Sequence, residues 1–309
     1  MEKEVKFIYI VGRGFSGTTM LDALLGNSGQ IESVGELVSG LSRYDIELCS
    51  CGKLTEDCIF WQTIKKEFNL RNGDNSFTAF AKQSIDQANV KNYFSTLFNI
   101  QKYRGLAASN RIMYEAIASV NGRNWVLDSS KEITRGLFLA RLDNRVKFIH
   151  VIRRPEGQIS SLYYRLNKGL PLKFLRKEYY PKYKFLPISF EAIAWSMGNL
   201  LAEFLKLFAP KRTIRIKFEN LLNNPAHELD RLGKFLNINF DEIKNKIQNN
   251  EDFYVNHSMG GNEFRHEKVF KFQKEAKTRR VMPLGFKIWI KILCWPLIII
   301  YGYNIFKNE

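Results

Sequence analysis

A glycine-rich turn between a strand and a helix is the feature that most constrains the fold of this chain. Residues 5–11 read VKFIYIV, a short apolar run rich in strand-forming residues, and residues 18–26, TTMLDALLG, place leucine and alanine at helical spacing. The glycine-rich turn GRGFSG (12–17) joins the two. This order of strand, glycine loop and helix is typical of α/β folds that bind phosphate groups at a helix N-terminus.

The loop satisfies two nucleotide-binding patterns at once. Gly12, Gly14 and Gly17 have the spacing of a dinucleotide-binding turn, whereas Gly12 and Gly17 followed by Thr18 and Thr19 have the spacing of a phosphate loop that lacks its lysine. The two threonines favour the phosphate loop, because hydroxyl and backbone N–H groups at a helix N-terminus bind phosphate oxygens. The missing lysine argues against hydrolysis of ATP or GTP and favours a nucleotide with a shorter, less charged 5′ tail.

The alternation of strand and helix recurs along the chain. Further strand-like runs, each followed by a segment of helical pattern, cover residues 124–128, 146–152 and 213–218. Buried strands separated by helices predict an α/β fold with three layers (αβα) around a central parallel sheet. Because ligands of such sheets bind at the carboxyl ends of the strands, we expect the residues after Val11, Asp128 and Ile152 to surround one crevice.

The chain is long enough for one sizeable core, which predicts a single domain over residues 1–280. Residues 38–123 are predicted to form a mostly helical insertion at the active-site edge. The basic, aromatic stretch 168–187 is interpreted as a lid, an acceptor surface or a solvated loop. Residues 281–309 form a hydrophobic tail whose stretch 285–306 is expected to dock on the domain or to lie at a membrane interface, because its uncharged part is shorter than the ~20 residues of a membrane span.

A second anion site is indicated by the segment VKFIHVIRRPEGQISSLYYR. A strand ends near Arg153, a proline turn follows, and Ser161 lies in the helical segment after it. A guanidinium and a hydroxyl near a helix start can bind a second anionic group, separate from the glycine loop. Two such sites on adjacent strands imply a ligand with a phosphate at each end.

These motifs together resemble those of the sulfotransferases that use 3′-phosphoadenosine 5′-phosphosulfate (PAPS). The family loop reads G-x-x-[RK]-[ST]-G-[ST]-T after the first strand, and its 3′-phosphate motif is an arginine followed by seven residues and a serine, much as Arg153 and Ser161 stand here. Residues 218–238 and 257–265 also resemble family segments, so the resemblance covers most of residues 5–270.

The resemblance implies a fold like that of the P-loop nucleoside triphosphatases, PAPS as donor and adenosine 3′,5′-bisphosphate as product. It implies an acceptor hydroxyl or amine on a carbohydrate, a lipid or a small metabolite. It also implies a donor site at Arg153, at Ser161 and at a closing loop that contains Gly261, Asn262 and Arg265. The loop residues implied for donor binding are Gly12, Arg13, Gly14, Phe15, Ser16, Gly17, Thr18 and Thr19.

One position departs from the family pattern. The family has Arg or Lys directly before the Ser-Gly of the loop, whereas this chain has Phe15, so the task of neutralising the transferred group passes to Arg13 or to Lys131. Similarity to the family also makes Glu36 the candidate general base, against the alternative that it caps or pairs with the following helix. Asp128 is interpreted as orienting Lys131, which would stabilise the leaving oxygen; a solvated lysine at a helix start is the alternative.

Cys49, Cys51 and Cys58 cluster in CSCGKLTEDC, but the local sequence supplies no fourth ligand or histidine. We therefore favour a simple thiol cluster on a loop over a metal or disulfide role. We also expect no metal dependence, because no acidic pair is placed to hold Mg²⁺ against the phosphates. Among the histidines, His150 is interpreted as a core residue of a strand, and His257 is a weaker candidate site residue because it precedes a glycine pair.

The net charge of +16 favours an anionic partner. The basic residues are scattered and the aromatic-rich modules of nucleic-acid-binding proteins are missing, so nucleic acid is not the expected partner. Residues 1–14 show acidic residues in place of a basic signal-peptide start, which leads to the expectation of a cytoplasmic protein with peripheral membrane contact through its tail. The alternatives to the sulfotransferase are a nucleotide kinase or NTPase, a dehydrogenase, and a noncatalytic protein that binds anions or membranes.

Overall fold

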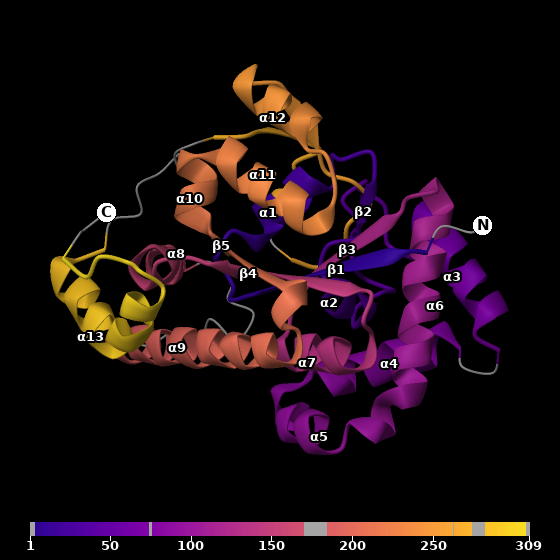
Figure 1. The fold of residues 1–309 in the computed structure, drawn as a ribbon, viewed down its shortest axis with the longest axis horizontal. Helices are drawn as coiled ribbons and strands as arrows, with labels where there is room; N and C mark the ends of the chain where they lie inside the picture. The colour runs from indigo at the N-terminus through magenta and orange to yellow at the C-terminus, as the bar shows by residue number, and fades with distance from the viewer. Residues whose placement is uncertain (1–3, 74–75, 170–183, 262, 274–281, 307–309) are drawn as a thin grey trace.

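The computed structural model describes residues 4–73, 76–169, 184–261, 263–273 and 282–306 (Figure 1). Of the residues and segments singled out above, Asn262 and most of the 168–187 stretch lie outside these described ranges.

Five parallel strands form the central sheet in the order β2-β3-β1-β4-β5. The strands lie close to the runs that the sequence indicates, and their parallel pairing confirms the predicted fold class. A separate antiparallel pair is formed by β6 and β7. The strand bounds are β1 (Lys6–Gly12), β2 (Ile31–Ser33), β3 (Trp125–Lys131), β4 (Val146–Ile152), β5 (Thr213–Lys217), β6 (Asp252–Tyr254) and β7 (Val269–Lys271).

Helices occupy most of the chain between the strands. The α-helices of the described residues are α1 (Thr18–Leu25), α2 (Leu37–Leu41), α3 (Ile59–Arg71), α4 (Phe77–Ala88), α5 (Tyr93–Phe98), α6 (Arg104–Asn121), α7 (Ile133–Leu142), α8 (Pro155–Asn167), α9 (Phe185–Phe208), α10 (Phe218–Asn223), α11 (Pro225–Leu236), α12 (Asp241–Gln248) and α13 (Leu284–Ile300). Short 3-10 helices cover Val90–Asn92, Ile100–Tyr103, Pro210–Arg212 and Glu263–His266.

The side chains of β1 alternate between two cores, which makes the fold three-layered. Phe7, Tyr9 and Val11 pack with α2, α3, α4, α6, α7 and α9 on one face of the sheet. Ile8 and Ile10 pack with α1, α10, α11 and α12 on the other face. Figure 1 shows these two groups of helices below and above the sheet. The helices α3, α4, α5 and α6 fall between residues 38 and 123. Of these, α6 contacts β2 and β3 and packs with α3, whereas α5 packs against α7 (Figure 1).

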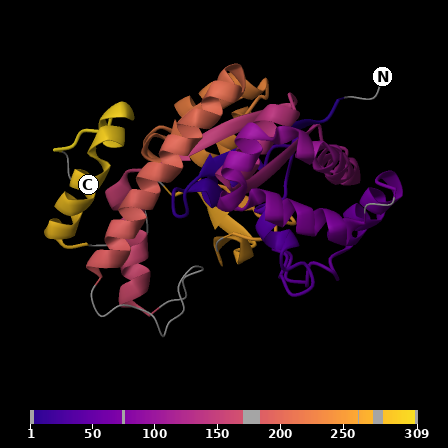
Figure 2. The same cartoon turned by 90° about the horizontal axis from the view of Figure 1, so that it is seen from below.

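The C-terminal helix α13 packs against α8 and α9 rather than against the sheet (Figure 2). Its residues Ile290, Cys294, Leu297 and Ile298 are buried in a third apolar core that also includes Trp195 of α9. The hydrophobic tail is therefore docked on the domain along one side. Its other side, which carries apolar side chains, remains exposed.

Among the described residues, one helix is long and apolar enough to cross a membrane by length and composition, and this helix is α9. Its polar side chains contact the domain: Glu191 pairs with Arg13 of the glycine loop, and the Asn199 amide oxygen lies 3.0 Å from His150 Nε2 in the sheet. His150 is buried in this contact, as its position within a strand predicts. The helix therefore packs on the domain through one face.

Candidate functional site

The loop between β1 and α1 is shaped by two glycines that leave no room for a side chain. A Cβ atom at Gly12 would lie 2.9 Å from the Val151 carbonyl oxygen of the neighbouring strand, and one at Gly17 would lie 2.1 Å from the Phe218 ring. Gly17 also has a φ of 90°, a left-handed conformation that favours glycine, and it directly precedes Thr18 at the start of α1. The loop thus brings bare backbone to a helix N-terminus, the arrangement that binds phosphate groups.

The remaining loop residues show which positions packing requires. The Ser16 hydroxyl donates a 2.7 Å hydrogen bond to the Arg13 carbonyl oxygen and is buried, and Thr18 is buried as well. Thr19 is half-buried on the first turn of α1. Gly14 is exposed, and a Cβ atom there would meet nothing within 4 Å. The described structure therefore requires glycine at two of the three positions that make up the dinucleotide pattern.

Arg153 contacts the same loop from the neighbouring strand. It follows β4, which pairs with β1, and its guanidinium donates a 3.1 Å hydrogen bond to the Phe15 carbonyl oxygen while stacking on the Phe218 ring. Phe15 has a φ of 64°, uncommon for a residue with a side chain, and Arg165 lies 5.8 Å from its ring centroid. Two guanidinium groups therefore flank the loop at the residue where the family pattern has its own cation.

Ser161, the proposed partner of Arg153, lies on α8 and is buried. The helix begins at Pro155, so Ser161 stands in its second turn rather than at its first residues. Arg153 thus lies in the connection from β4 to α8 beside the glycine loop, and Ser161 lies on the helix that follows it.

Glu36 and Lys131 form an ion pair, although 95 residues separate them. Lys131 is the last residue of β3 and has a φ of 74°, while Glu36 precedes α2 and is buried. The Glu36 side chain makes no capping hydrogen bond to α2, so it is held by the lysine of the adjacent strand and not by its own helix. The candidate base and the candidate cation therefore meet at the carboxyl edge of the sheet.

Arg13, predicted to neutralise the transferred group, contacts α9 in the structure, and its role at the transferred group stays a prediction. The Arg13 guanidinium forms an ion pair with Glu191 of α9 at 3.1 Å, and its side chain packs against Gly198 of the same helix. Of the two basic residues suggested as replacements for the cation missing at Phe15, Lys131 is the one that lies beside Glu36.

The interpretation that Asp128 orients Lys131 was wrong, because the two side chains have different partners. The Asp128 carboxylate accepts hydrogen bonds from the Tyr114 hydroxyl at 2.8 Å and from Arg135 Nε at 3.3 Å. Arg135 is fully buried, and its guanidinium also donates to the Asn110 side chain at 2.7 Å. Asp128 therefore belongs to a buried polar network beneath the site, while Lys131 is held by Glu36.

The C-terminal loop contacts the site at Glu36. Gly261 has a φ of 85°, and a Cβ atom there would lie 3.2 Å from Glu36 Oε1. Arg265 forms a buried ion pair with Glu47 and donates a 2.6 Å hydrogen bond to the Leu48 carbonyl oxygen. Burial lowers the pKa of Arg265, against the opposing charge of Glu47. These residues thus support Glu36 and the adjacent loop, and the role of Arg265 at a 3′-phosphate stays a prediction without a contact behind it.

Two buried carboxyl groups near the site were missed by sequence reasoning. Burial raises the pKa of Asp22, on α1, to about 7, although hydrogen bonds from Ser33 and Ser129 oppose the shift. Burial also raises the pKa of Glu132, next to Lys131, to about 7. An acidic residue on the apolar side of a predicted helix was the available signal for Asp22.

The conclusion that the three cysteines lack a fourth ligand was wrong. His257, about 200 residues further along the chain, places its Nδ1 atom 3.3 Å from Cys58 Sγ and 3.7 Å from Cys49 Sγ. Segments far apart in sequence meet here because residue 259 pairs with residue 35 beside β2. The preference for a simple thiol cluster was drawn from an incomplete ligand set.

Comparison with known proteins agrees with this geometry. The model of the sulfotransferase family matches residues 8–242, well over half of the chain. The chain belongs to the sulfotransferase family. It is therefore a sulfotransferase enzyme, and family membership implies that it uses PAPS. This decides against the kinase, the dehydrogenase and the noncatalytic alternatives.

One solved structure supports the fold of this sulfotransferase, and two others are similar at a lower level. The sulfotransferase domain from the curacin biosynthetic pathway is 17% identical, with a TM-score of 0.52 over 97% of this chain and 98% of that chain. The sulfotransferase domain of the Synechococcus olefin synthase is 17% identical, with a TM-score of 0.40 over 78% and 77% of the two chains. A Mycobacterium tuberculosis sulfotransferase is 15% identical, with a TM-score of 0.44 over 78% and 70%. The sequence matches none of the curated proteins.

Proposed function

We propose that this sulfotransferase moves the sulfuryl group of PAPS to a hydroxyl or amine of a carbohydrate, lipid or small-molecule acceptor. One observation carries the proposal: the glycine loop, Arg153 and the Glu36–Lys131 pair line the carboxyl edge of one parallel sheet. A donor with phosphate groups at both ends needs two anion-binding elements, and the acceptor needs a base near the transferred group.

The residues at this edge fit such a donor. The backbone of the glycine loop faces the N-terminus of α1, and the Gly12 and Gly17 positions exclude side chains from it. These N–H groups would hold the 5′-phosphosulfate, whereas Arg153 and Ser161 would hold the 3′-phosphate. The donor supplies the sulfuryl group; the chain supplies position and charge, since sulfuryl transfer resembles phosphoryl transfer in needing alignment and cations more than covalent help.

The Glu36–Lys131 pair would act on both the acceptor and the leaving group. In the free enzyme the lysine forms an ion pair with the carboxylate and holds it in place. When a donor anion competes for the Lys131 ammonium, the Glu36 carboxylate becomes available to accept the acceptor proton, and the ammonium stabilises charge on the leaving oxygen. Donor binding and base activation are coupled through this one ion pair.

Replacement of Arg153 by alanine tests the two-phosphate assignment. We expect the affinity for adenosine 3′,5′-bisphosphate, measured by calorimetric titration, to fall about 10- to 100-fold, because a charge-assisted hydrogen bond contributes roughly 1.5–3 kcal/mol. The exposed Lys168 at the C-terminal end of α8 provides the control, since Lys168→Ala removes an equal charge at a distance from the glycine loop's end of the helix. Unchanged bisphosphate binding in Arg153→Ala, or a preference of the wild-type protein for ATP, AMP or NAD, contradicts the assignment.

We also propose that the enzyme contacts membrane surfaces from the cytoplasmic side through α9 and α13. Apolar side chains repeat at helical spacing on the exposed sides of both helices, and the net charge of +16 suits anionic lipid headgroups. The side chains of α13 on this face are Leu284, Ile288, Ile292, Trp295 and Ile299. An interfacial position of these helices would bring the site close to lipid-linked acceptors.

Vesicle binding tests this location. We expect Ile299→Asp to lower co-sedimentation with vesicles containing anionic lipid by at least about tenfold, since a carboxylate replaces an apolar contact at the interface. Leu70→Asp is the matched control, because Leu70 is exposed to a similar degree on α3, far from α13. Equal losses in the two variants, or no vesicle binding by the wild-type protein, would rule out a membrane contact at α13.

A further inference from the structure

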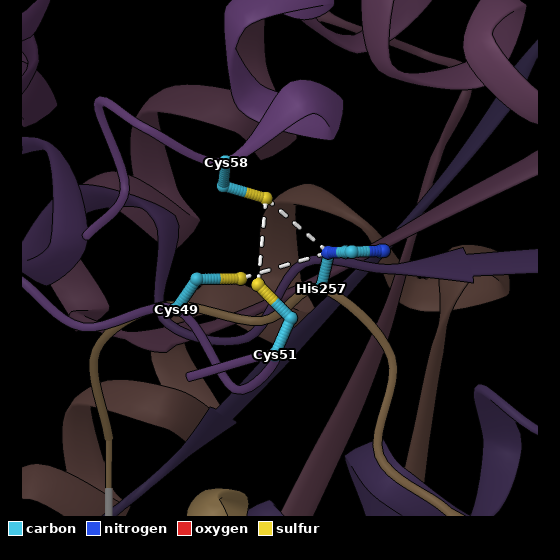
Figure 3. Close-up of side chains that lie close together, drawn as sticks. All are labelled: Cys49, Cys51, Cys58 and His257. Carbon is cyan, nitrogen blue, oxygen red and sulfur yellow. Dashed lines mark hydrogen bonds between the residues drawn. The ribbon is translucent and has the colours of Figure 1, made fainter. Parts of the chain in front are cut away.

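Three cysteines and one histidine converge between the helical region and the C-terminal segment (Figure 3). The thiols of Cys49, Cys51 and Cys58 and the His257 ring point toward one centre. Their four ligand atoms all lie within 4.8 Å of one another. Cys51 Sγ is 3.7 Å from Cys58 Sγ, and His257 Nδ1 is 3.3 Å from Cys58 Sγ and 3.7 Å from Cys49 Sγ.

The three shorter separations, from 3.3 to 3.7 Å, are close to the edges of a tetrahedral metal site. Zinc binds cysteine sulfur at about 2.3 Å and histidine nitrogen at about 2.0–2.1 Å, which places neighbouring ligand atoms of a tetrahedron about 3.4–3.8 Å apart. Without an ion, these four groups could attract one another only through hydrogen bonds. Such bonds are much weaker than metal coordination, since thiols are weak hydrogen-bond partners. The ligand atoms are arranged around a space that suits one cation.

The backbone of the cysteine loop presents two of the thiols from a tight turn. Residues Leu48 and Leu54 form an antiparallel bridge, the Cys49 N–H donates to the Lys53 carbonyl oxygen at 2.9 Å, and the Gly52 N–H donates to the Cys49 carbonyl oxygen at 2.9 Å. Gly52 has a φ of 90°, which lets the chain reverse directly after Cys51. The Cys-x-Cys-Gly sequence therefore forms a small rigid turn, and Cys58 closes the set from the start of α3.

The histidine is held in place by contacts of its own. Its ring stacks on Phe60 at a centroid distance of 5.0 Å and an angle of 13°. Next to it, the Ser50 N–H donates to the Ser258 carbonyl oxygen at 3.0 Å, and the Ser258 N–H donates back to the Ser50 hydroxyl at 2.9 Å. The two chain segments that supply the ligands are thus hydrogen-bonded to each other next to the cluster.

We propose that Cys49, Cys51, Cys58 and His257 bind one Zn²⁺ ion as a structural site. Four protein ligands complete a tetrahedron and leave no position open for water or substrate, which is the difference between a structural and a catalytic zinc site. Three thiolates and a neutral imidazole are the soft ligands that zinc prefers, and binding releases the thiol protons to solvent. The site is separate from the donor site, and the ion takes no part in the chemical step of the proposed reaction.

The position of the cluster gives the metal a consequence for the active site. His257 lies two residues before Met259, whose carbonyl oxygen accepts a 2.8 Å hydrogen bond from the Glu36 N–H and whose own N–H donates to Val34 at 3.1 Å. The ion would therefore link two parts of the chain: the segment 257–259, which hydrogen-bonds to the Glu36 backbone, and the turn at Cys49. Loss of the ion is expected to loosen this support without removing any donor-binding residue.

Metal content is the direct test. We expect the full chain, purified under reducing conditions, to contain about one zinc ion, measured by inductively coupled plasma mass spectrometry, and Cys58→Ser to reduce this below about one fifth. Cys294→Ser is the matched control, because Cys294 is buried in the third core beside Ala192 and should leave the zinc content unchanged. Replacement of zinc by Co²⁺ should produce the visible absorption bands of a tetrahedral site with sulfur ligands.

Measurements on the wild-type protein keep the proposal testable if Cys58→Ser does not fold. Removal of the metal by a chelator should lower the melting temperature, and stoichiometric Zn²⁺ should restore it. Reduced protein that binds no Zn²⁺ or Co²⁺, zinc retained in Cys58→Ser, or a disulfide among these thiols in place of a metal would each overturn the proposal. None of these readouts depends on sulfuryl transfer, so failure of the zinc site and failure of the proposed reaction are distinguishable.

Discussion

Replacement of Glu36 by glutamine is expected to lower turnover by about 100- to 10,000-fold, the usual contribution of a general base. Glutamine keeps the size of the side chain and its hydrogen bond to Lys131, but it cannot accept a proton from the acceptor. The affinity for adenosine 3′,5′-bisphosphate should not fall, because Glu36 is assigned no contact with this ligand and glutamine leaves the Lys131 ammonium available to its 5′-phosphate. Turnover is measured with labelled PAPS, and affinity by calorimetry.

Glu32→Gln is the control for this experiment. Glu32 is a buried carboxylate of β2 that accepts a 2.8 Å hydrogen bond from Asn121, and its register partner in β3 is Val126 rather than Lys131. A buried charge is removed in both variants, but only Glu36 pairs with the lysine of the site. A loss of less than about tenfold in Glu36→Gln with intact bisphosphate binding would show that another group is the base.

The loss of activity caused by replacing Lys131 should depend on whether Glu36 is present. If the pair acts as one unit, the double variant Glu36→Gln/Lys131→Met should lose little more activity than Glu36→Gln alone, because residues that act together give non-additive losses. Independent roles would make the two losses multiply. The comparison therefore separates a coupled base and cation from two neighbours that happen to touch.

The central fold was predictable because it depends on local patterns. The runs that became β1, β3, β4 and β5 are apolar, short and followed by helical periodicity, and their parallel order places Gly12, Lys131 and Arg153 at one edge. Glu36, which follows the short strand β2, lies at the same carboxyl edge for the same reason. The backbone position of the candidate site thus follows from the parallel arrangement of the strands, which the sequence pattern indicates, whereas the order of the strands comes from the structure.

Side-chain partners were less predictable, since they depend on segments far apart in the chain. Arg13 turns to Glu191 on α9, and Asp128 pairs with Arg135 below the site, because a charged side chain takes the nearest opposite charge that packing brings to it. The zinc ligands show the same limit. Cys49 and Cys58 are local, but His257 joins them only after the C-terminal segment lies beside β2.

Replacement of Asp128 by alanine is expected to destabilise the fold by about 3–5 kcal/mol, which is the cost of leaving a buried charge unpaired. Arg135 is fully buried and takes its charge partner from Asp128, while the Tyr114 hydroxyl donates to the same carboxylate. Alanine would leave the guanidinium without a counter-ion in the core. Urea unfolding followed by circular dichroism measures the change in the free energy of unfolding.

The double variant Asp128→Leu/Arg135→Met distinguishes a structural from a catalytic role for Asp128. Removing both charges together should recover most of the stability lost in Asp128→Ala, because an apolar pair of similar size can replace a buried ion pair at little net cost. If Asp128 is structural, turnover per folded molecule should recover along with stability, because Glu36 and Lys131 remain in place. Restored stability with turnover still reduced more than about 100-fold would instead assign Asp128 to the chemistry, and would mean that the network below the site reaches the acceptor.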